Sequence, residues 1–289
     1  MRKVAFLGLG NMGFPMAGHL SACGYDVVVY NRTESVAERW LESFTGASAA
    51  TPAEACVGAD VVITCVGDDA DLKDVLCGSV GAFSAMQAGA VLIDHTTASA
   101  QTARELAQIA AERELDFLDA PVSGGQAGAQ QGQLTVMVGG QQAVFERVKP
   151  VIQCYAKSLT LMGQVGSGQL AKMVNQICVA GLLQGLSEGL HFAERAGLDV
   201  EAVMQVVSQG AASSWQMQNR YQSMLAGEFD FGFAVKWMRK DLRYVMDEAR
   251  NCGAQLPVTA LVDQFYAEVE SMGGAQWDTS SLIQRLRER

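Results

Sequence analysis

Residues 2–30, RKVAFLGLGNMGFPMAGHLSACGYDVVVY, decide the fold of this chain. They predict an apolar strand over residues 2–7, a glycine turn over 8–13, a helix to about Cys23 that ends at Gly24, and a second strand over 26–30. A strand, a glycine turn, a helix and a strand within thirty residues is the setting in which the pattern G-x-G-x-x-G binds a dinucleotide. We therefore expect a dinucleotide-binding unit at the start of the chain.

Each glycine of this turn has a separate physical role. Gly8 permits the tight turn, Gly10 lets a pyrophosphate approach the backbone, and Gly13 lets helix and strand pack closely. The start of the helix adds N–H groups and the positive end of its dipole. A turn that serves packing alone is the alternative, and the surrounding pattern disfavours it. The residues expected at the cofactor here are Gly8, Leu9, Gly10, Asn11, Met12 and Gly13.

The end of the second strand bears on which cofactor is used. An NAD site usually has Asp or Glu here to accept from the ribose 2′-OH, whereas this chain has Asn31-Arg32-Thr33. Arg32 can pair with a 2′-phosphate and Thr33 can donate a hydroxyl, so NADP is preferred over NAD. The alternative is a solvated Arg32 beside a helix whose N-cap is Thr33, and Glu34 is a mild argument against a phosphate.

Further buried strands are expected over residues 60–66, 90–94 and 115–119, each separated from the next by a helix. Near-continuous apolar strands that alternate with helices predict a parallel sheet covered on both faces, with ligands at the carboxyl ends of the strands. The loops there place Val66, Gly67, Thr96 and Thr97 near the cofactor. Thr96 and Thr97 either hold the nicotinamide ribose or cap the helix that begins near Ser99.

The loop after residue 119 contains Ser123, Gly124 and Gly125. A hydroxyl beside bare backbone N–H groups can cradle a carboxylate, although an ordinary flexible turn would have the same sequence. Strands over 134–138 and 158–161 complete the sheet, and only helices are expected after Gly166. Those helices are predicted over residues 168–196, 199–209, 213–226, 234–252, 257–272 and 279–288.

The fold class is thus α/β, with an N-terminal doubly wound Rossmann-type sheet followed by an all-α C-terminal domain. We place a dinucleotide-binding domain at residues 1–165 and a helical substrate and oligomerisation domain at 166–289, which begins with a long interdomain helix. The apolar residues of that helix cover more than one stripe, so it is expected to be mostly buried. A large apolar helical domain also favours a homo-oligomer, a homodimer or homotetramer.

A lysine stands in the first turns of the long helix, in Gly166-Ser-Gly-Gln-Leu-Ala-Lys172-Met-Val-Asn175-Gln176. Lys172 shares a helical face with Asn175 and Gln176, three and four residues on. A lysine in a buried apolar environment usually has a charged or polar partner or a functional role. Near the start of a helix, its aliphatic chain can instead extend so that the ammonium group reaches solvent. The segment alone leaves both readings open.

Composition excludes several classes of function. The chain has 289 residues, 49% hydrophobic, with a net charge of −10 and a pI near 4.8, which argues against nucleic acid as a partner. Three histidines without a cluster predict no metal site, and His95 is expected to be structural. Seven cysteines without metal or redox spacing are expected to be reduced and to pack as small core hydrophobes. Polar breaks in the long helix argue against a membrane span, and the start does not resemble a signal peptide, so we expect a cytoplasmic protein.

Four motifs resemble the β-hydroxyacid dehydrogenase family, which includes 3-hydroxyisobutyrate dehydrogenase, and the resemblance covers essentially the whole chain. They are GLGNMGFPMA from Gly8, DAPVSGG from Asp119, GSGQLAK from Gly166, and KDL from Lys240. The resemblance implies that Lys172 is catalytic, that Ser123, Gly124 and Gly125 hold the substrate carboxylate, and that Lys240 approaches the cofactor from a 6-phosphogluconate dehydrogenase-like C-terminal domain. The family often has Asn four residues after the lysine. Here Gln176 stands there and Asn175 precedes it, so either amide could orient the substrate.

The reaction that the resemblance implies is hydride transfer between NADP(H) or NAD(H) and a small β-hydroxy acid or semialdehyde, such as 3-hydroxyisobutyrate or methylmalonate semialdehyde. Lys172 would be the general acid and base. The triplet at 31–33 resembles the NADPH-using branch, so an NADPH-dependent reductase of glyoxylate, succinic semialdehyde or tartronate semialdehyde is the alternative, and L-serine is a further candidate substrate. An imine reductase and a non-catalytic nucleotide-binding protein are remote alternatives, and Lys172 at its motif position argues against both.

Overall fold

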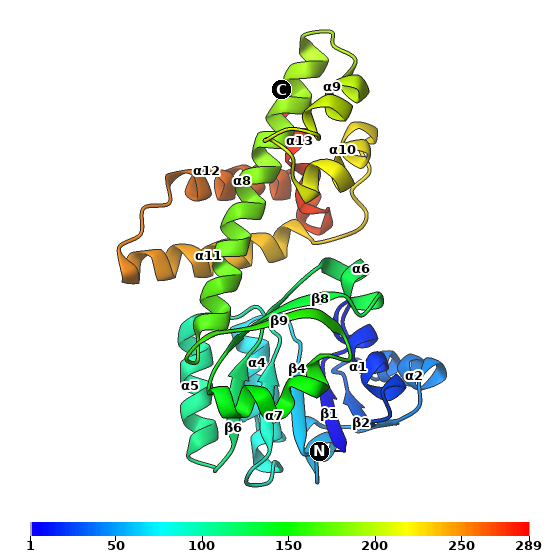
Figure 1. Cartoon of the computed structure of the whole chain (residues 1–289), viewed down its shortest axis with the longest axis vertical. Coiled ribbons are helices and arrows are strands. Elements are labelled where there is room, and N and C mark those ends of the chain that lie inside the picture. The colour runs from blue at the N-terminus through cyan, green and yellow to red at the C-terminus, as the bar shows by residue number, and fades with distance from the viewer. Residues whose placement is uncertain (1, 289) are drawn as a thin grey trace. The chain divides into compact units, whose positions relative to one another are not determined.

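The computed structural model describes residues 2–288 and divides the chain into two compact units (Figure 1). The first unit ends at Lys172 and the second begins at Met173. Helix α8 (Ser167–Arg195) contains this boundary, so Lys172 is the last residue of the first unit.

The first unit is built on one sheet. Its parallel strands are β1 (Lys3–Leu7), β2 (Asp26–Tyr30), β3 (Ala47–Ser48), β4 (Val61–Thr64), β5 (Val91–Asp94) and β6 (Asp116–Asp119). Their spatial order is β3-β2-β1-β4-β5-β6, so the direction of winding reverses between β1 and β4. In open sheets of this kind, ligands bind at the carboxyl ends of the strands beside that reversal.

The sheet continues past β6 with strands of mixed direction. These are β7 (Val122–Ser123), β8 (Leu134–Gly139) and β9 (Ala156–Gly163). Strand β8 runs antiparallel to β6 and to β7, and β9 runs parallel to β8. The sequence predicted β8 and β9 but gave no direction for them, because an apolar strand pattern is the same in either direction.

Helices cover both faces of this sheet. They are α1 (Gly13–Ala22), α2 (Glu34–Ser43), α3 (Pro52–Cys56), α4 (Asp69–Cys77), α5 (Ala100–Ala111), α6 (Gly125–Gln130) and α7 (Gln142–Ile152). Alternate residues of β1 enter different cores: Val4 and Phe6 pack in one cluster, and Ala5 and Leu7 in the other. A strand buried on both faces confirms the predicted doubly wound arrangement.

The regular elements of the second unit are all helices among its described residues, as predicted, with one isolated β-bridge between Ala234 and Asp278. After α8 it contains α9 (Val200–Val207), α10 (Trp215–Ala226), α11 (Val235–Cys252), α12 (Pro257–Ser271) and α13 (Leu282–Arg287). A short 3₁₀ turn, Thr279–Ser281, precedes α13, so the last predicted helix is divided in two. Two apolar clusters form its interior, one around Tyr266 and the other around Met224.

The expected burial held only in part. Helix α8 is buried or half-buried at most positions, as expected, but Val174 is 61% exposed and Leu182 is 47% exposed. Four of the seven cysteines are exposed rather than in the core: Cys23, Cys77, Cys178 and Cys252. In both cases residues in an apolar stretch of sequence, which predicts burial, lie at the surface. No helix within residues 2–288 is long and apolar enough to cross a membrane.

Candidate active site

The glycine turn lies between β1 and α1, beside the reversal of the sheet. Gly8 has a φ of +104°, and a Cβ there would overlap the carbonyl oxygen of Cys65. A Cβ on Gly13 would overlap the carbonyl oxygen of Gly8, so strand and helix can pack this closely only with glycine. On Gly10, by contrast, a Cβ would meet no described atom within 4 Å beyond its two neighbours in the chain. The turn therefore presents open backbone where a pyrophosphate is expected, and it fits a dinucleotide.

Asn31 supports this turn. Its Oδ1 accepts a hydrogen bond from Leu9 N at 2.9 Å, and its Nδ2 donates to Thr33 O at 2.9 Å. The side chain at the position where an NAD site usually has a carboxylate thus braces the loop. Its predicted contact with the cofactor remains a prediction.

Arg32 lies on the surface beside Asn31. Its side chain is 81% exposed, and Nη1 lies 2.9 Å from Asp71 Oδ1. An exposed ion pair of this kind contributes less than about 1 kcal/mol, so it can be exchanged for a bound phosphate. Thr33 occupies the N-cap position of α2, as the alternative required, but its side chain makes no capping hydrogen bond within the described residues.

The ends of β4 and β5 are tied together by a buried carboxyl group. Asp94 Oδ1 accepts from Thr64 Oγ1 at 2.7 Å and from Thr96 N at 3.0 Å. Thr96 Oγ1 in turn accepts from Val66 N at 3.1 Å. Burial raises the pKa of Asp94 to about 7. The cofactor loops after β4 and β5 are therefore held as one unit by Asp94, which the sequence analysis did not single out.

The helix that follows Thr96 and Thr97 is capped by another residue. Ser99 is the N-cap of α5, and its hydroxyl accepts from Thr102 N at 3.0 Å. Ser99, and not Thr96 or Thr97, therefore occupies the N-cap position of this helix. Thr96 is buried and uses its hydroxyl as a brace for Val66, whereas Thr97 is half-buried.

His95 faces the interior of the first unit. Its Nδ1 lies 2.5 Å from Ala120 O, and its Nε2 lies 2.8 Å from the hydroxyl of Tyr155. Burial lowers its pKa to about 4, so the ring is neutral, donating from Nδ1 to the carbonyl and accepting from the phenol at Nε2. Both ring nitrogens are used in structural contacts, Nδ1 with Ala120 and Nε2 with Tyr155. Within residues 2–288, no group of three or more His, Cys, Asp or Glu side chains is placed to hold a metal ion.

The proposed carboxylate cradle follows Ala120 by three residues. Ser123 ends β7, and the next two residues adopt positive φ angles, +129° for Gly124 and +62° for Gly125. Both glycines are exposed. This backbone conformation favours glycine and leaves the main chain uncovered, which suits a loop that must bind an anion with N–H groups.

The first turn of α8 is fixed by a buried carboxylate and a buried amide. Asp119 accepts from Gly166 N at 2.7 Å through Oδ1 and from Gln169 N at 2.9 Å through Oδ2. Burial raises the pKa of Asp119, and the backbone donors oppose that rise. Gln169 Oε1 accepts from Ala98 N at 3.1 Å, and its Nε2 donates to Thr96 O at 2.8 Å. Sequence reasoning missed both residues, although each stands in a quoted motif.

Lys172 lies one turn further along α8 and is 8% exposed. This low exposure disagrees with the interpretation in which the Lys172 side chain extends to solvent. It therefore favours the reading in which the lysine has a partner or a task.

In the second unit, Gln176 uses both ends of its amide. Its Nε2 donates to Asp241 Oδ2 at 2.6 Å, and its Oε1 accepts from Asn175 Nδ2 at 2.8 Å. Asp241 also pairs with Lys240, whose Nζ lies 3.2 Å from Oδ1. Asp241 is 2% exposed and Lys240 is 6% exposed, so this ion pair is buried.

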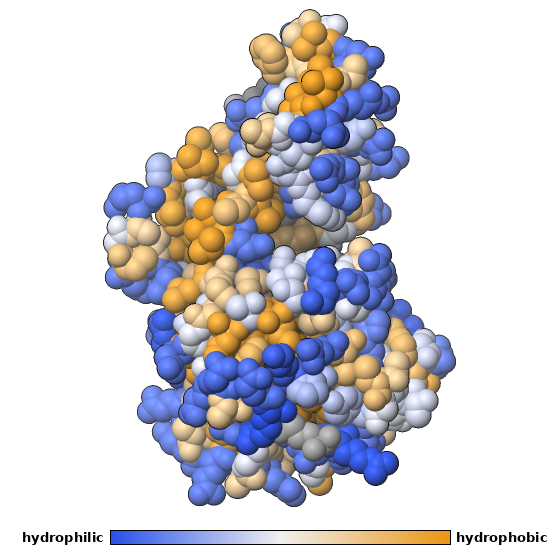
Figure 2. Space-filling view, viewed as in Figure 1, coloured by the Kyte–Doolittle hydropathy of each residue, from blue (hydrophilic) through white to orange (hydrophobic). Residues whose placement is uncertain are grey.

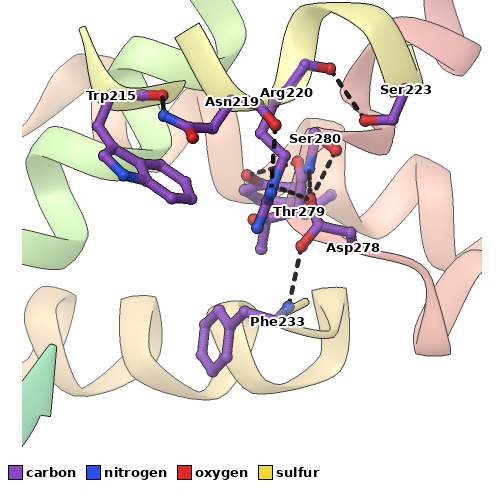
Figure 3. A network of polar contacts seen from close by, with 9 residues as sticks. Trp215, Asn219, Arg220, Ser223, Phe233, Asp278, Thr279 and Ser280 are labelled. Carbon is purple, nitrogen blue, oxygen red and sulfur yellow. Dashed lines mark hydrogen bonds and ion pairs between the residues drawn. The ribbon is translucent and has the colours of Figure 1, made fainter. Parts of the chain in front are cut away.

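A second polar network in this unit is centred on Asp278 (Figure 3). Its carboxylate accepts from Phe233 N at 2.9 Å and from Ser280 Oγ at 2.6 Å, and it pairs with Arg220 Nε at 3.5 Å. The guanidinium of Arg220 lies 4.9 Å from the ring centroid of Trp215. This network fixes the start of α10 and the loop before α11.

Comparison with known proteins agrees with this architecture. Residues 3–163 match the family described as the NAD binding domain of 6-phosphogluconate dehydrogenase. Residues 166–286 match the family described as NAD-binding of NADP-dependent 3-hydroxyisobutyrate dehydrogenase.

Individual relatives match along their whole length. The chain is 60% identical to an uncharacterized oxidoreductase of Shewanella frigidimarina, with 99% of this chain and 98% of the relative covered. It is 37% identical to 2-hydroxy-3-oxopropionate reductase of Escherichia coli, with 98% and 97% covered. The structure of Mycobacterium tuberculosis 3-hydroxyisobutyrate dehydrogenase with L-serine aligns with a TM-score of 0.89 at 30% identity, with 99% of each chain covered. These matches confirm the resemblance and the enzyme class expected from the sequence.

Proposed function

The chain belongs to the β-hydroxyacid dehydrogenase family and is an NAD(P)-dependent, 3-hydroxyisobutyrate dehydrogenase-like oxidoreductase. We propose that it interconverts a small β-hydroxy acid and its semialdehyde, such as 3-hydroxyisobutyrate and methylmalonate semialdehyde, with Lys172 as general acid and base. The observation that carries this proposal is the buried Lys172, one turn after a helix start that is hydrogen-bonded to the cofactor loop at Thr96.

Each part of the chemistry has a candidate residue. A bound nicotinamide supplies or accepts the hydride. Lys172 stabilises the negative charge that develops on the carbonyl oxygen and gives it a proton; in oxidation it takes that proton from the hydroxyl. The Ser123 hydroxyl and the N–H groups of Gly124 and Gly125 bind the substrate carboxylate. Of the two candidate amides, Gln176 is engaged with Asp241 and Asn175, so its role would be to hold Asn175 in place.

A reductase of tartronate semialdehyde, glyoxylate or succinic semialdehyde is the second candidate. It is supported by the relative in Escherichia coli whose name is 2-hydroxy-3-oxopropionate reductase. L-serine stays a candidate because the aligned Mycobacterium tuberculosis structure contains it. The lysine present at position 172 argues against an imine reductase and against a non-catalytic protein.

The substrate proposal is tested by oxidation of NADPH and NADH with methylmalonate, tartronate and succinic semialdehydes and with glyoxylate. The reverse reaction is measured with 3-hydroxyisobutyrate and L-serine. Propanal is the matched control, because it offers the aldehyde without a carboxylate. We expect a carboxylate-bearing compound to react with a kcat/KM at least about tenfold above that of propanal, the effect of one charged hydrogen bond. Equal rates with propanal, or no turnover with any compound, would contradict the proposal.

We propose NADP as the preferred cofactor, held through Arg32. Loss of a charge-assisted contact with the 2′-phosphate costs about 1.5–3 kcal/mol. Arg32→Ala should therefore raise the KM for NADPH by about 10- to 100-fold and leave that for NADH nearly unchanged. Asp71→Asn removes the residue that competes for Arg32, so it should lower the KM for NADPH. Equal effects of Arg32→Ala on both cofactors would refute the phosphate contact.

We also propose a homodimer or homotetramer that uses an exposed stripe of α8. Three glycines lie at spacings of four along it, and beyond the adjacent backbone of α8 itself a Cβ on any of them would meet no described atom within 4 Å; they are Gly181, Gly185 and Gly189. Val174 at 61%, Leu182 at 47% and Phe192 at 69% are exposed on the same face of the helix. Figure 2 shows hydrophobic residues over the middle of α8 and over α12, where Val258 is 62% exposed and Leu261 53%. Bare glycine positions flanked by apolar side chains suit the close approach of the same helix from a second copy.

This interface is tested by the mass of the protein in solution from light scattering. Gly185→Arg and Leu182→Glu should each lower the mass, from a dimer to one chain or from a tetramer to a smaller assembly. Val57→Glu is the control, since Val57 is 57% exposed but belongs to the first unit. An unchanged mass in both α8 variants would exclude the stripe as the interface.

A cytoplasmic location is also part of the proposal. It is supported by the four exposed cysteines, none of which forms a disulfide bond, as is usual in a reducing compartment.

A further inference from the structure

We propose that Gln169 is a positioning residue for Lys172. Its buried amide joins the first turn of α8 to the segment Thr96–Ala98 and so sets where the lysine stands relative to the cofactor loop. This inference rests on the proposed function, in which Lys172 exchanges a proton with the substrate.

Three hydrogen bonds converge on Gln169, which is fully buried. Its backbone N–H donates to Asp119 Oδ2 at 2.9 Å, Oε1 accepts from Ala98 N at 3.1 Å, and Nε2 donates to Thr96 O at 2.8 Å. The side-chain amide of Gln169 therefore forms hydrogen bonds with both a backbone donor and a backbone acceptor of the same loop. An apolar side chain of the same size could fill this space but could not fix the loop at two points.

The Gln169 amide extends a chain of contacts that begins at the cofactor loops. Thr96, whose carbonyl receives the Gln169 amide, accepts from Val66 N through its hydroxyl at 3.1 Å. Val66 and Thr96 are both expected at the cofactor. Residues three apart on a helix share one face, so Lys172 follows Gln169 on the same side of α8. The sequence of contacts from Val66 through Thr96 and Gln169 thus ends one helical turn from the lysine.

Packing of the first turn limits how far it can slide. A Cβ on Gly168 would overlap the backbone oxygen of Met137, and it would lie 2.7 Å from that of Asp119. A Cβ on Gly139 would lie 2.8 Å from Gly168 N. Backbone therefore touches backbone at the start of α8, and the Asp119 carboxylate caps its donors. These contacts hold the turn in place without Gln169, so the loss of its amide should alter the alignment of helix and loop more than the fold.

The test replaces Gln169 by Met, which has a similar length and lacks both hydrogen bonds, and by Glu, which has the same shape but faces Thr96 O with an acceptor. A displacement of about 1 Å at a reacting group can cost 100-fold in rate. We expect kcat, expressed per cofactor-binding site, to fall about 10- to 100-fold. The KM for substrate and the Kd for the cofactor should change by less than about threefold. The solvent deuterium isotope effect on kcat should increase, because proton transfer from a misplaced Lys172 becomes rate-limiting.

Gln184→Met is the matched control. Gln184 is also a buried glutamine of α8, at 6% exposure, and its amide contacts Glu188 on the same helix. Its replacement should leave kcat and the isotope effect within about twofold of the original values. Counting cofactor-binding sites removes any unfolded fraction from the comparison, and Gln169→Glu serves where Gln169→Met does not fold.

The possible results distinguish a failure of the positioning role of Gln169 from a failure of the proposed function. If the unaltered enzyme has no turnover, or if Lys172→Ala keeps its turnover, the proposed function fails. If turnover depends on Lys172 while both Gln169 variants keep kcat within about threefold and an unchanged isotope effect, only the positioning role is overturned. A fall in kcat that Gln184→Met reproduces would also overturn it.

Discussion

Replacing Asp94 by Asn is expected to remove a pH dependence from the stability of the first unit. Asp94 is fully buried, and its Oδ1 accepts from Thr64 Oγ1 and Thr96 N. Its Oδ2 has no hydrogen-bond partner within the described residues. Burial raises the pKa from 3.8 to about 7; the hydrogen bonds from Thr96 and Thr64 oppose the rise, and the charge of Asp119 adds to it.

The sign and size of the effect follow from linkage. Between the two pKa values the folded protein holds a proton that the unfolded chain releases, so stability is lost as pH rises through that interval. A difference from 3.8 to about 7 corresponds to about 4 kcal/mol, at about 1.4 kcal/mol per pKa unit. Asn does not titrate in this range, so it makes no pH-dependent contribution to the free energy of unfolding. The unfolding free energy of the unaltered protein, minus that of Asp94→Asn, should therefore fall by about 4 kcal/mol from below pH 4 to pH 8.

The comparison between two proteins is necessary because His95 acts in the opposite sense. Burial lowers its pKa from 6.5 to about 4, so its contribution is present above pH 6.5 and is lost as pH falls toward 4. His95 is common to both proteins and cancels in the difference. Urea unfolding followed by circular dichroism at a series of pH values supplies the free energies. A difference that stays constant within about 1 kcal/mol across this range would refute a protonated, buried Asp94.

Two further changes test the packing of the units, and calorimetry measures both. Gly168→Ala should lower the free energy of unfolding by about 1–3 kcal/mol, because its Cβ would overlap backbone oxygen at the start of α8. Gly128→Ala, whose Cβ would have its nearest contact at 3.4 Å, is the control and should leave that free energy unchanged. Equal melting temperatures of the two variants would contradict this packing. Asp278→Asn should cost about 2–3 kcal/mol, because a charged acceptor for Phe233 N and Arg220 is lost. Asp247→Asn, which breaks an exposed pair with Arg250, should cost less than about 1 kcal/mol. A loss at Asp278 no larger than at Asp247 would show that the network is not stabilising.

The elements with strong periodicity were predictable from the sequence. Strand β2 occupies residues 26–30 as expected, and α8 covers Ser167–Arg195 against a prediction of 168–196. The elements that were not predicted include β3 and β7, with two residues each, and α6 with six. Segments this short carry no periodic pattern and form through contacts with their neighbours.

The site divides in the same way. The glycine turn was predictable because its chemistry is local, and the overlaps at Gly8 and Gly13 agree with the roles assigned to them. The partners of Arg32 and Gln169 were not predictable, because they lie 39 and 73 residues away along the chain. Asp119 gave a signal that could have been used, since a carboxylate at the end of a buried strand requires donors. Here the start of α8 supplies them.

The role of Lys172 is tested most directly by the turnover of Lys172→Ala with the best substrate of the panel, measured together with cofactor affinity. We expect kcat to fall by about 10²- to 10⁴-fold, the usual contribution of a general acid, while the Kd for the cofactor stays within about threefold. Turnover at the level of the unaltered enzyme, with the cofactor bound normally, would show that Lys172 is not the proton donor.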